Sequence, residues 1–448
     1  MRPRSLASLL VILTLTCRVC AQVNLGTNPA TGSGSLTVNA GDFFSGTLSV
    51  AGGTLYLGSN FSIAALNVLA FSGSGSSLNY TGGTPFTLTL PATSSVTRSG
   101  TGYTYFYDPI ANSGTVAVTG GTAYGNANFS NFAGGSLAVS AGAAYSQSTS
   151  YTFSNAVGAT ASVSGSGSVL TIANPSNLGS LAANSSGVLQ LAGAFTTANL
   201  GTITLATGGS VELTGSLNNA GATLGTTTDG SAYVLKGTIT GGTVASGAIT
   251  PNGGTLDGVT VNGNLPVGAQ SVTLKNATTF SGTASVAGGT FYLGTNLSLL
   301  AGSTLAFSGS GSSLNYTGGT PFTLTLPATS SVTRSGTGYT YFYDPIANSG
   351  TVSVTGGTVF GNASFTNQAT GLVSVSGSGS IFNFSNLTNL GSLSADTNGV
   401  LSLTGSFLTS ISAASPSHPA ASSKSPAVAR LTTPVPRSAP PPTVAPIL

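Results

Sequence analysis

Two copies of the heptapeptide YTYFYDP hold the most distinctive side chains of this 448-residue chain, one beginning at Tyr103 and the other at Tyr339. Strand alternation would place one set of tyrosines on one face of each copy: Tyr103, Tyr105 and Tyr107 in the first, and Tyr339, Tyr341 and Tyr343 in the second. Facing outward, three phenols would form a ligand-contact surface for sugar rings or an apolar partner. Facing inward, they would fill a core, and this packing interpretation is preferred.

An arginine precedes each heptapeptide by five residues, and an aspartate is its sixth residue. These pairs are Arg98 with Asp108 and Arg334 with Asp344. We expect each pair to form an ion pair that at a surface contributes no more than ~1 kcal/mol.

Catalytic chemistry has little support in the sequence. Enzymes with β-helix folds need clustered acids, yet the body holds only seven scattered ones: Asp42, Asp108, Glu212, Asp229, Asp257, Asp344 and Asp396. The one histidine, His418, lies in a proline-rich tail, which leaves the body without a histidine for a catalytic triad. Metal-ligand clusters and phosphate-binding motifs are also missing, so we predict a chain with no enzymatic activity and no cofactor.

Charge is scarce and unevenly distributed. Charged residues make up 4% of the chain, and Gly, Ser, Thr, Asn and Ala take their place, which leaves little from which to build amphipathic helices. The formal net charge of +3 comes from the two ends, because the body has four basic and seven acidic residues. Nucleic-acid binding needs clustered Lys and Arg, so we predict that this chain does not bind nucleic acid.

Residues 1–21 read as a secretory signal peptide. Arg2 and Arg4 precede the apolar run LASLLVILTLT, and small residues end at Ala21. Both cysteines, Cys17 and Cys20, fall inside this segment, so the mature chain would have no thiol. No later run approaches the ~18 apolar residues of a membrane helix. We expect secretion or display at a cell surface.

A long internal repeat defines the organisation of the chain. Residues 71–116 recur without a change at 307–352, and similarity at the same offset extends on both sides. We assign residues 22–270 to the first copy and 271–407 to a truncated second copy. A repeat of this kind favours an array over separate globular domains.

Short alternating strands between glycines, such as GTLSVAGG and GTVAVTGG, recur throughout both copies. The phrase FSN at Phe129 returns at Phe153, and beyond Ser162 the offset between the two copies shrinks by this same step. Losing one whole coil keeps a solenoid in register. We therefore predict an all-β, right-handed parallel β-helix with coils of about 20–28 residues, fifteen to eighteen in all. Tandem β-sandwich domains are the alternative.

Recurring asparagines suit the turns of such coils, and amide ladders from coil to coil are expected of them. The residues concerned are Asn60, Asn131, Asn155, Asn199, Asn296 and Asn367.

The segment 408–448 is rich in proline and serine and lacks alternation. One interpretation is a disordered linker or stalk. The sharper interpretation is a frameshift, because legal codons from Thr409 onward, read from their third base, give FNLGSITLTPGGKLQVTG. This text matches NLGTITLATGGSVELTG, which follows Ala198 in the first copy.

In its signal-like start, Gly-Thr-rich strand phrases, coil-length deletion and scarcity of charge, residues 22–407 resemble the β-helical passengers of bacterial autotransporter and filamentous-haemagglutinin-like adhesins. The resemblance implies export, surface display and a structural or adhesive role toward extracellular polysaccharide or a host or neighbouring cell, with self-association also open. A polysaccharide-binding or polysaccharide-cleaving β-helix is the alternative, and the truncated product of a degenerate gene is another.

Overall fold

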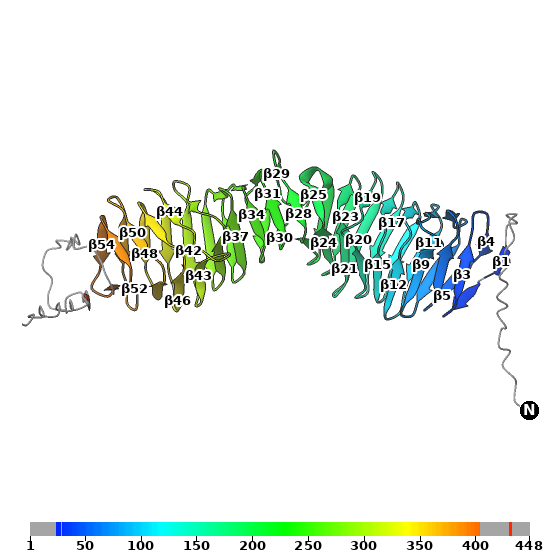
Figure 1. The fold of residues 1–448 in the computed structure, drawn as a ribbon, viewed down its shortest axis with the longest axis horizontal. Helices are drawn as coiled ribbons and strands as arrows, with labels where there is room; N and C mark the ends of the chain where they lie inside the picture. Colours follow the sequence, from blue (N-terminus) through cyan, green and yellow to red (C-terminus); the bar gives the residue numbers. More distant parts are fainter. Residues whose placement is uncertain (1–23, 28, 404–429, 432–448) are drawn as a thin grey trace, which may run out of the picture.

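The computed structural model describes residues 24–27, 29–403 and 430–431, which form a curved rod of short strands (Figure 1). The expected signal peptide at residues 1–21 and nearly all of the segment 408–448 lie outside the described residues. One 3₁₀ turn, η1 (Thr197–Asn199), is the only helical element in the described part of the chain.

Each coil contributes three strands, so a strand pairs with the third strand before it and the third after it. For example, β14 pairs with both β11 and β17, and every pairing between described strands is parallel. The stack has about 18 turns, which confirms the predicted parallel β-solenoid. Tandem β-sandwiches would need antiparallel hairpins and are excluded.

We call the three strand positions of a coil series 1, 2 and 3. Series 1 contains β1 (Asn24–Thr27), β4 (Phe43–Ser45), β7 (Phe61–Ser62), β10 (Leu88–Leu90), β13 (Ile110–Asn112), β16 (Phe129–Asn131), β19 (Phe153–Asn155), β22 (Pro175–Asn177), β25 (Ala194–Thr196), β28 (Ser216–Asn218), β31 (Thr238–Thr240), β34 (Thr255–Asp257), β37 (Ser271–Lys275), β40 (Thr290–Leu293), β43 (Ser312–Tyr316), β46 (Tyr339–Phe342), β49 (Thr358–Gly361), β52 (Ile381–Phe384) and β55 (Val400–Leu403), with β56 (Arg430–Leu431) paired to β55.

Series 2 contains β2 (Ala30–Gly32), β5 (Thr47–Ala51), β8 (Val68–Ser72), β11 (Ser95–Arg98), β14 (Thr115–Val118), β17 (Ser136–Val139), β20 (Thr160–Ser164), β23 (Ser180–Asn184), β26 (Thr202–Ala206), β29 (Thr223–Leu224), β32 (Thr243–Val244), β35 (Thr260–Val261), β38 (Thr279–Phe280), β41 (Leu297–Ser298), β44 (Leu324–Leu326), β47 (Ile346–Asn348), β50 (Phe365–Asn367) and β53 (Leu387–Asn389).

Series 3 contains β3 (Ser35–Val38), β6 (Thr54–Leu57), β9 (Ser76–Tyr80), β12 (Tyr103–Phe106), β15 (Thr122–Gly125), β18 (Ala144–Gln147), β21 (Val169–Ala173), β24 (Val188–Ala192), β27 (Ser210–Leu213), β30 (Tyr233–Leu235), β33 (Ile249–Pro251), β36 (Leu265–Gly268), β39 (Thr283–Ala287), β42 (Thr304–Ser308), β45 (Ser331–Arg334), β48 (Thr351–Val354), β51 (Leu372–Val375) and β54 (Ser392–Ala395).

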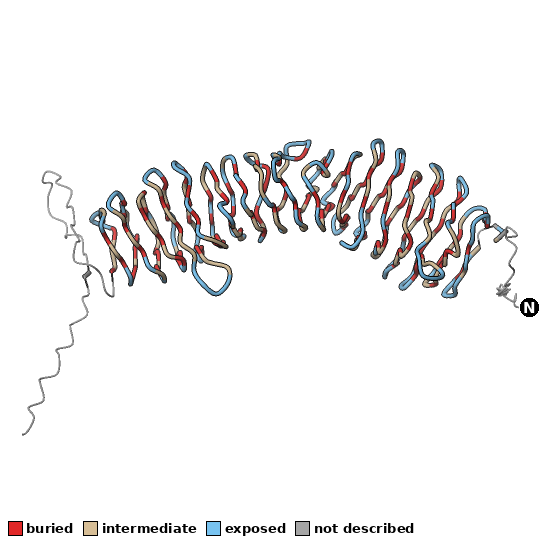
Figure 2. Tube along the Cα trace, turned by 45° about the horizontal axis from the view of Figure 1, so that its top comes forward, coloured by how far each residue is buried: buried red, intermediate tan, exposed pale blue. Residues whose placement is uncertain are grey.

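A single hydrophobic core runs along the rod axis from Val38 to Leu403. Alternation turns every second side chain of a strand inward, and parallel register stacks these side chains in rows. One such row is Val116, Leu137 and Ala161, all of them buried. Figure 2 shows the result, with buried and more exposed positions alternating along each coil and exposed residues concentrated at the corners.

Buried asparagines form two ladders beneath the corner that follows the FSN-type strands. In the first ladder the side-chain amides of Asn112, Asn131 and Asn155 each donate to the side-chain oxygen of the next member, ending at Asn177, with distances of 2.8 Å throughout. The second ladder joins Asn348, Asn367 and Asn389 at 2.8 and 2.7 Å. The expectation of amide ladders is confirmed for Asn131, Asn155 and Asn367.

The other expected asparagines have different roles. The side-chain oxygens of Asn60 and Asn296 each accept from a backbone N–H of the next coil, at Thr87 and Thr323, both at 2.8 Å. Asn199 closes η1, where its side-chain oxygen accepts from the Thr196 N–H at 3.0 Å. These residues still fix one coil to the next or shape a turn, but they do not stack on other amides.

Coil length varies more than the sequence pattern predicts. Phe129 pairs with Phe153, which is the step that the repeated FSN phrase predicts. Near the middle of the rod, however, Thr238 already pairs with Thr255, and this coil is shorter than the expected range. In these central coils β32 and β35 are only two residues long.

The solenoid predicts that whole coils are removable units. Deleting residues 129–152 joins Asn128 to Phe153 and lets Asn112 meet Asn155, so we expect the variant to keep its β-sheet circular dichroism and a Tm within a few degrees of the parent. Deleting residues 129–140, half a coil, should abolish cooperative unfolding because every later strand loses its register. Equal effects of the two deletions would contradict the coil as the structural unit.

Candidate ligand-binding face

The tyrosines of the first heptapeptide lie on the outer face of β12. Tyr103 is 42% exposed and Tyr105 and Tyr107 are half-buried, whereas the alternating Thr104 and Phe106 point into the core. The preferred packing interpretation of these tyrosines is therefore wrong. Their orientation follows from Phe106, which sits in register with Leu78 of the core row and fixes which face of the strand points inward.

Four rings gather here, and we call them the first aromatic cluster: Tyr103, Tyr105, Tyr107 and Tyr124. Tyr105 lies at the centre, with ring centroids 5.4 Å from Tyr103, 5.6 Å from Tyr107 and 5.3 Å from Tyr124. The last two pairs are nearly parallel, at 23° and 22°. Each such pair stabilises by about 0.5–1.5 kcal/mol beyond the area that it buries.

The second copy builds the second aromatic cluster from Tyr339, Tyr341, Tyr343 and Phe360. Tyr341 is again central, with ring centroids 5.9 Å from Tyr343 and 5.5 Å from Phe360, both pairs being stacked. Tyr339 lies 5.8 Å from Phe360 and is 50% exposed. Phe360 thus holds the place of Tyr124, without its hydroxyl.

Sequence reasoning missed Tyr124 and Phe360. They belong to the next coil, where β15 and β49 bring them into register with Tyr105 and Tyr341. The signal was available, since AYGN and VFGN occupy equivalent positions in the two copies of the repeat. It could be used only with the pairing register, which the strand phrases alone do not fix.

The clusters can contact a ligand through the exposed edges and faces of their peripheral rings and through the tyrosine hydroxyls. Tyr105 and Tyr341 have other rings stacked against them, so the accessible ring surface belongs to the peripheral rings. Tyr103 and Tyr339 are the most exposed of these, and Tyr124 and Tyr343 are exposed as well. Hydroxyl and amide side chains flank both clusters in register. Ser77 pairs with Tyr105 from the coil before it. Ser146 pairs with Tyr124, and Asn383 with Phe360, each from the coil after it.

The expected ion pair of Arg98 with Asp108 is wrong, and so is that of Arg334 with Asp344. Arg98 occupies an inward position in register with Phe71 and Val118, and it is fully buried. Its guanidinium donates to the carbonyls of the following corner, at Ser99 and, over 2.9 Å, at Thr101. Burial lowers the pKa of Arg98 and likewise that of Arg334, whose guanidinium donates to Thr337 O at 2.7 Å.

Glycine is required where the guanidinium meets the next coil. A Cβ at Gly121 would lie 2.7 Å from the Arg98 Nη2 atom, and the backbone there has a φ of +62°. Gly357 stands in the same relation to Arg334. Each arginine therefore needs a glycine at the equivalent corner of the next coil, where its guanidinium packs against the backbone.

Asp108 and Asp344 are buried beneath the clusters on the inward side of the chain. The Phe86 N–H donates to Asp108 Oδ1 at 3.0 Å, and the Phe322 N–H donates to Asp344 in the same way. The second carboxylate oxygen of each has no hydrogen-bond partner among the described residues. Burial raises the pKa of both carboxyls to about 6, against the lowering effect of that one hydrogen bond.

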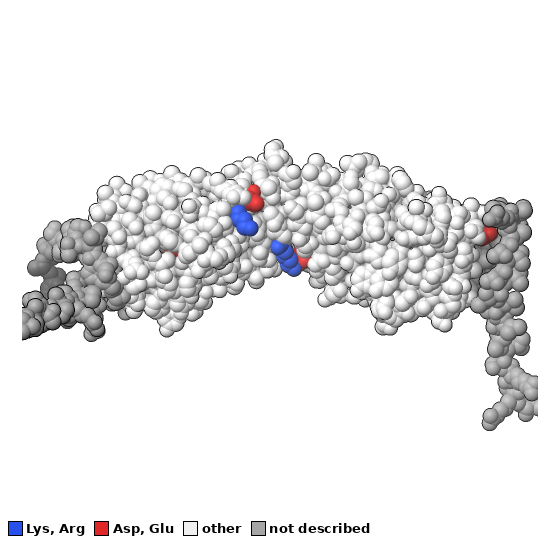
Figure 3. Space-filling view, in the orientation of Figure 1, with Lys and Arg blue, Asp and Glu red and all other residues white. Residues whose placement is uncertain are grey.

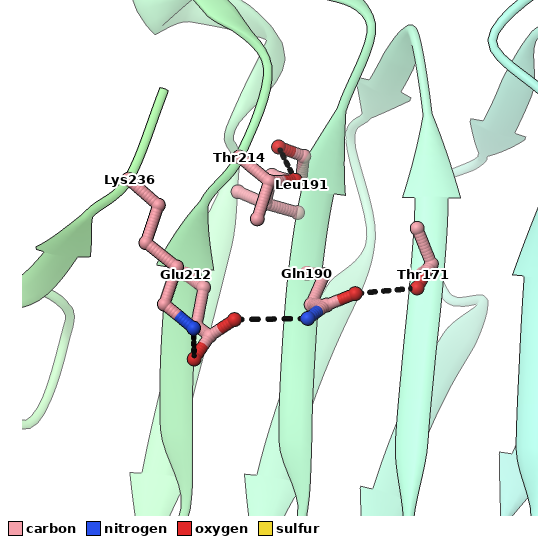
Figure 4. A network of polar contacts seen from close by, with 6 residues as sticks. All are labelled: Thr171, Gln190, Leu191, Glu212, Thr214 and Lys236. Carbon is pink, nitrogen blue, oxygen red and sulfur yellow. Dashed lines mark hydrogen bonds and ion pairs between the residues drawn. The ribbon is translucent and has the colours of Figure 1, made fainter. Parts of the chain in front are cut away.

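A polar network continues the outer face of series 3 beyond the first cluster (Figure 4). Thr171 donates to Gln190 at 2.8 Å, Gln190 donates to Glu212 at 2.9 Å, and Lys236 forms an ion pair with Glu212 at 2.6 Å. Such a surface pair contributes at most about 1 kcal/mol. The network explains Glu212 as a coil-to-coil link.

The remaining acids also serve local structure. Asp229 accepts from Thr227 and Ser231, Asp257 accepts from Asn276, and Asp396 accepts from the backbone of its own turn. Within residues 24–403, no three His, Cys, Asp or Glu side chains are grouped as metal ligands would be. The described part of the chain also has no helix long and apolar enough to cross a membrane.

A depression of about 470 Å³ opens beside the second cluster, at the corner above Arg334. Tyr339 borders it, and its other walls come from corner residues of three successive coils, among them Thr337, Thr355 and Ser378. Its lining has no charged side chain. The depression therefore enlarges the uncharged surface next to the exposed ring of Tyr339.

Comparison with known proteins assigns no family or function to this chain. No family model matches the sequence, and no curated protein matches it. Among solved structures, one that matches is described as the TibC-catalyzed hyper-glycosylated TibA55-350 fragment, with 16% identity over 85% of this chain and 100% of that chain. The TM-score is 0.22, so this likeness carries no argument about function.

The buried carboxyls predict a stability that falls as pH rises. Because the pKa of Asp108 and Asp344 is about 6 in the folded state and near 4 in the unfolded chain, the folded state holds more protons between these values. We expect Tm to drop by several degrees from pH 4.5 to pH 7. Asp229 and Asp396 act below this window, since their pKa values are lowered.

The variant with both Asp108→Asn and Asp344→Asn should lose most of this pH dependence, because asparagine keeps an acceptor for the Phe86 and Phe322 N–H groups without a titrating charge. Asp257→Asn is the matched control and should leave the slope unchanged. Calorimetry at five pH values measures it. An unaltered slope in the double variant would mean that other groups govern the pH response.

Proposed function

We propose that this chain is a structural and adhesive rod, secreted or displayed at a bacterial cell surface, that makes contact through its two aromatic clusters. Residues 1–21 support export, and the solenoid supports a rigid, extended body. The proposal rests on the outward orientation of the clusters, because Tyr103 and Tyr339 expose 42% and 50% of their surface. Rings placed there bury little of themselves against the protein's own core and are available to a partner.

The chemistry of the face favours binding over reaction. The clusters offer ring edges and hydroxyls on the outside of the rod. The neighbouring carboxyls, Asp108 and Asp344, point inward and are buried. A general acid must reach the bond that it protonates, and neither carboxyl is placed to do so. The proposal is therefore of recognition without catalysis.

The test compares ring removal at the clusters with ring removal elsewhere on the same strand series. The purified chain from residue 22 onward is measured for binding to bacterial cells and to immobilised neutral and acidic polysaccharides. We expect the double variant Tyr103→Ser, Tyr339→Ser to bind at least tenfold more weakly. The control Tyr56→Ser, Tyr292→Ser removes two outward rings that lie outside the clusters.

Far-UV circular dichroism and Tm should be alike in both variants, because all four side chains are on the outside. If the two double variants lose binding equally, or if neither does, the clusters are not the contact surface.

A further inference from the structure

The two clusters do not occupy the same position in their coils. Tyr105 belongs to β12 in the 11-stranded sheet of series 3, whereas Tyr341 belongs to β46 in the 12-stranded sheet of series 1. From β12 to β46 the chain passes 34 strands, which is eleven coils and one further strand. In an untwisted prism the second cluster would therefore face another side of the rod.

Twist of the solenoid brings the clusters back to one side. In Figure 1, β9, β12 and β15 of series 3 lie along the lower, concave side of the rod at the right. The 12-stranded sheet of series 1 begins near the upper side with β25 and reaches the lower, concave side at the left with β43 and β46. Sheets twist in one sense, so the rotation accumulates over the intervening coils. It offsets the extra strand, so that β12 and β46, the strands that carry the clusters, both lie on the concave side.

The separation of the clusters follows from the coil rise. Neighbouring parallel strands are about 4.8 Å apart, so eleven coils set the clusters roughly 50 Å apart along the axis. No single small ligand reaches both. A partner that meets both must be long, or must repeat its binding unit at this distance.

The face between and around the clusters limits the chemistry of that partner. Neither cluster contains a charged side chain, and the neighbours in register are hydroxyl and amide residues such as Ser77, Ser146 and Asn383. Figure 3 shows most of the visible charges near the middle of the rod, with the two ends of the described part almost free of charge. The surface at each cluster therefore suits a ligand rich in hydroxyl groups and without charge, and between the clusters the charge of Lys236 is balanced by its ion pair with Glu212.

We infer that the two clusters act as one bivalent site for a single neutral polysaccharide chain that lies along the concave side. A polysaccharide repeats the same sugar unit, so two similar clusters, which differ by Tyr124 against Phe360, can hold it at two points, and its hydroxyls match the flanking Ser and Asn. A stable protein partner would bury about 800 Å² of this surface, well beyond the rings themselves. This inference rests on the proposed function and adds the class of ligand and the coupling between clusters.

Joining two binding events on one chain raises affinity without any new contact, commonly by a factor of 10²–10⁴. The experiment measures binding of the full mature chain to xyloglucan, galactomannan and mixed-linkage β-glucan, and to tetrasaccharides cut from each, which are too short to reach from one cluster to the other. The proteins are the parent, Tyr103→Ser, Tyr339→Ser, the double variant, and the Tyr56→Ser, Tyr292→Ser control.

We expect at least one long polysaccharide to bind the parent 100-fold more tightly than its tetrasaccharide does. Each single variant should lose most of that advantage, yet bind the tetrasaccharide with unchanged affinity and half the stoichiometry. Losses of only about twofold for the long chain in each single variant would show independent clusters and overturn the inference, while leaving an adhesive role intact.

Two other outcomes also overturn the inference. Binding to cells or acidic polysaccharides, with none to the neutral chains, would replace the ligand class. A concentration-dependent rise in sedimentation coefficient that disappears in the double variant would make a second copy of this chain the partner of the clusters. Absence of binding in every assay would remove the proposed function as well.

Discussion

Parallel, in-register stacking of coils is the constraint on which the rest of this structure depends. Every side chain stands about 4.8 Å from the equivalent side chain of the coils before and after it. Apolar residues then form the core rows, and asparagines form amide ladders in which each member satisfies the next. Like charges stacked at this distance would repel, which gives a physical reason for a chain with only 4% charged residues.

The fold was predictable because stacking leaves a periodic trace in the sequence. The step from Phe129 to Phe153, visible as a repeated phrase, is a direct pairing in the structure. The site was only partly predictable. The repeated heptapeptide singled out its six tyrosines, but the sequence interpretation did not give the face to which they point. Tyr124 and Phe360 join the clusters through register between coils of unequal length, and no single strand phrase contains that information.

The failure at Arg98 has a different cause. In SVTR the alternation places the arginine on the same face as Val96, so the pattern itself indicates an inward side chain. The expectation of an ion pair with Asp108 relied instead on opposite charge and short sequence separation. In a solenoid, the stretch between these two residues carries the chain past a corner onto the next face, so proximity in sequence does not give proximity in space. The guanidinium is satisfied by corner carbonyls.

The coil that carries each cluster also carries features that lower stability. A carboxyl with one unpartnered oxygen and a guanidinium without a carboxylate are both buried there, and burying either costs free energy. Exposed rings add apolar surface to the outside. The nearest coils hold Ser77, Ser146 and Thr171 at the outward positions in register with Tyr105 and Tyr124. The identity of the two copies does not indicate a functional requirement, because a recent duplication would also produce it. One coil combines several departures from the pattern that stabilises its neighbours, and such departures concentrate where a protein meets its ligand.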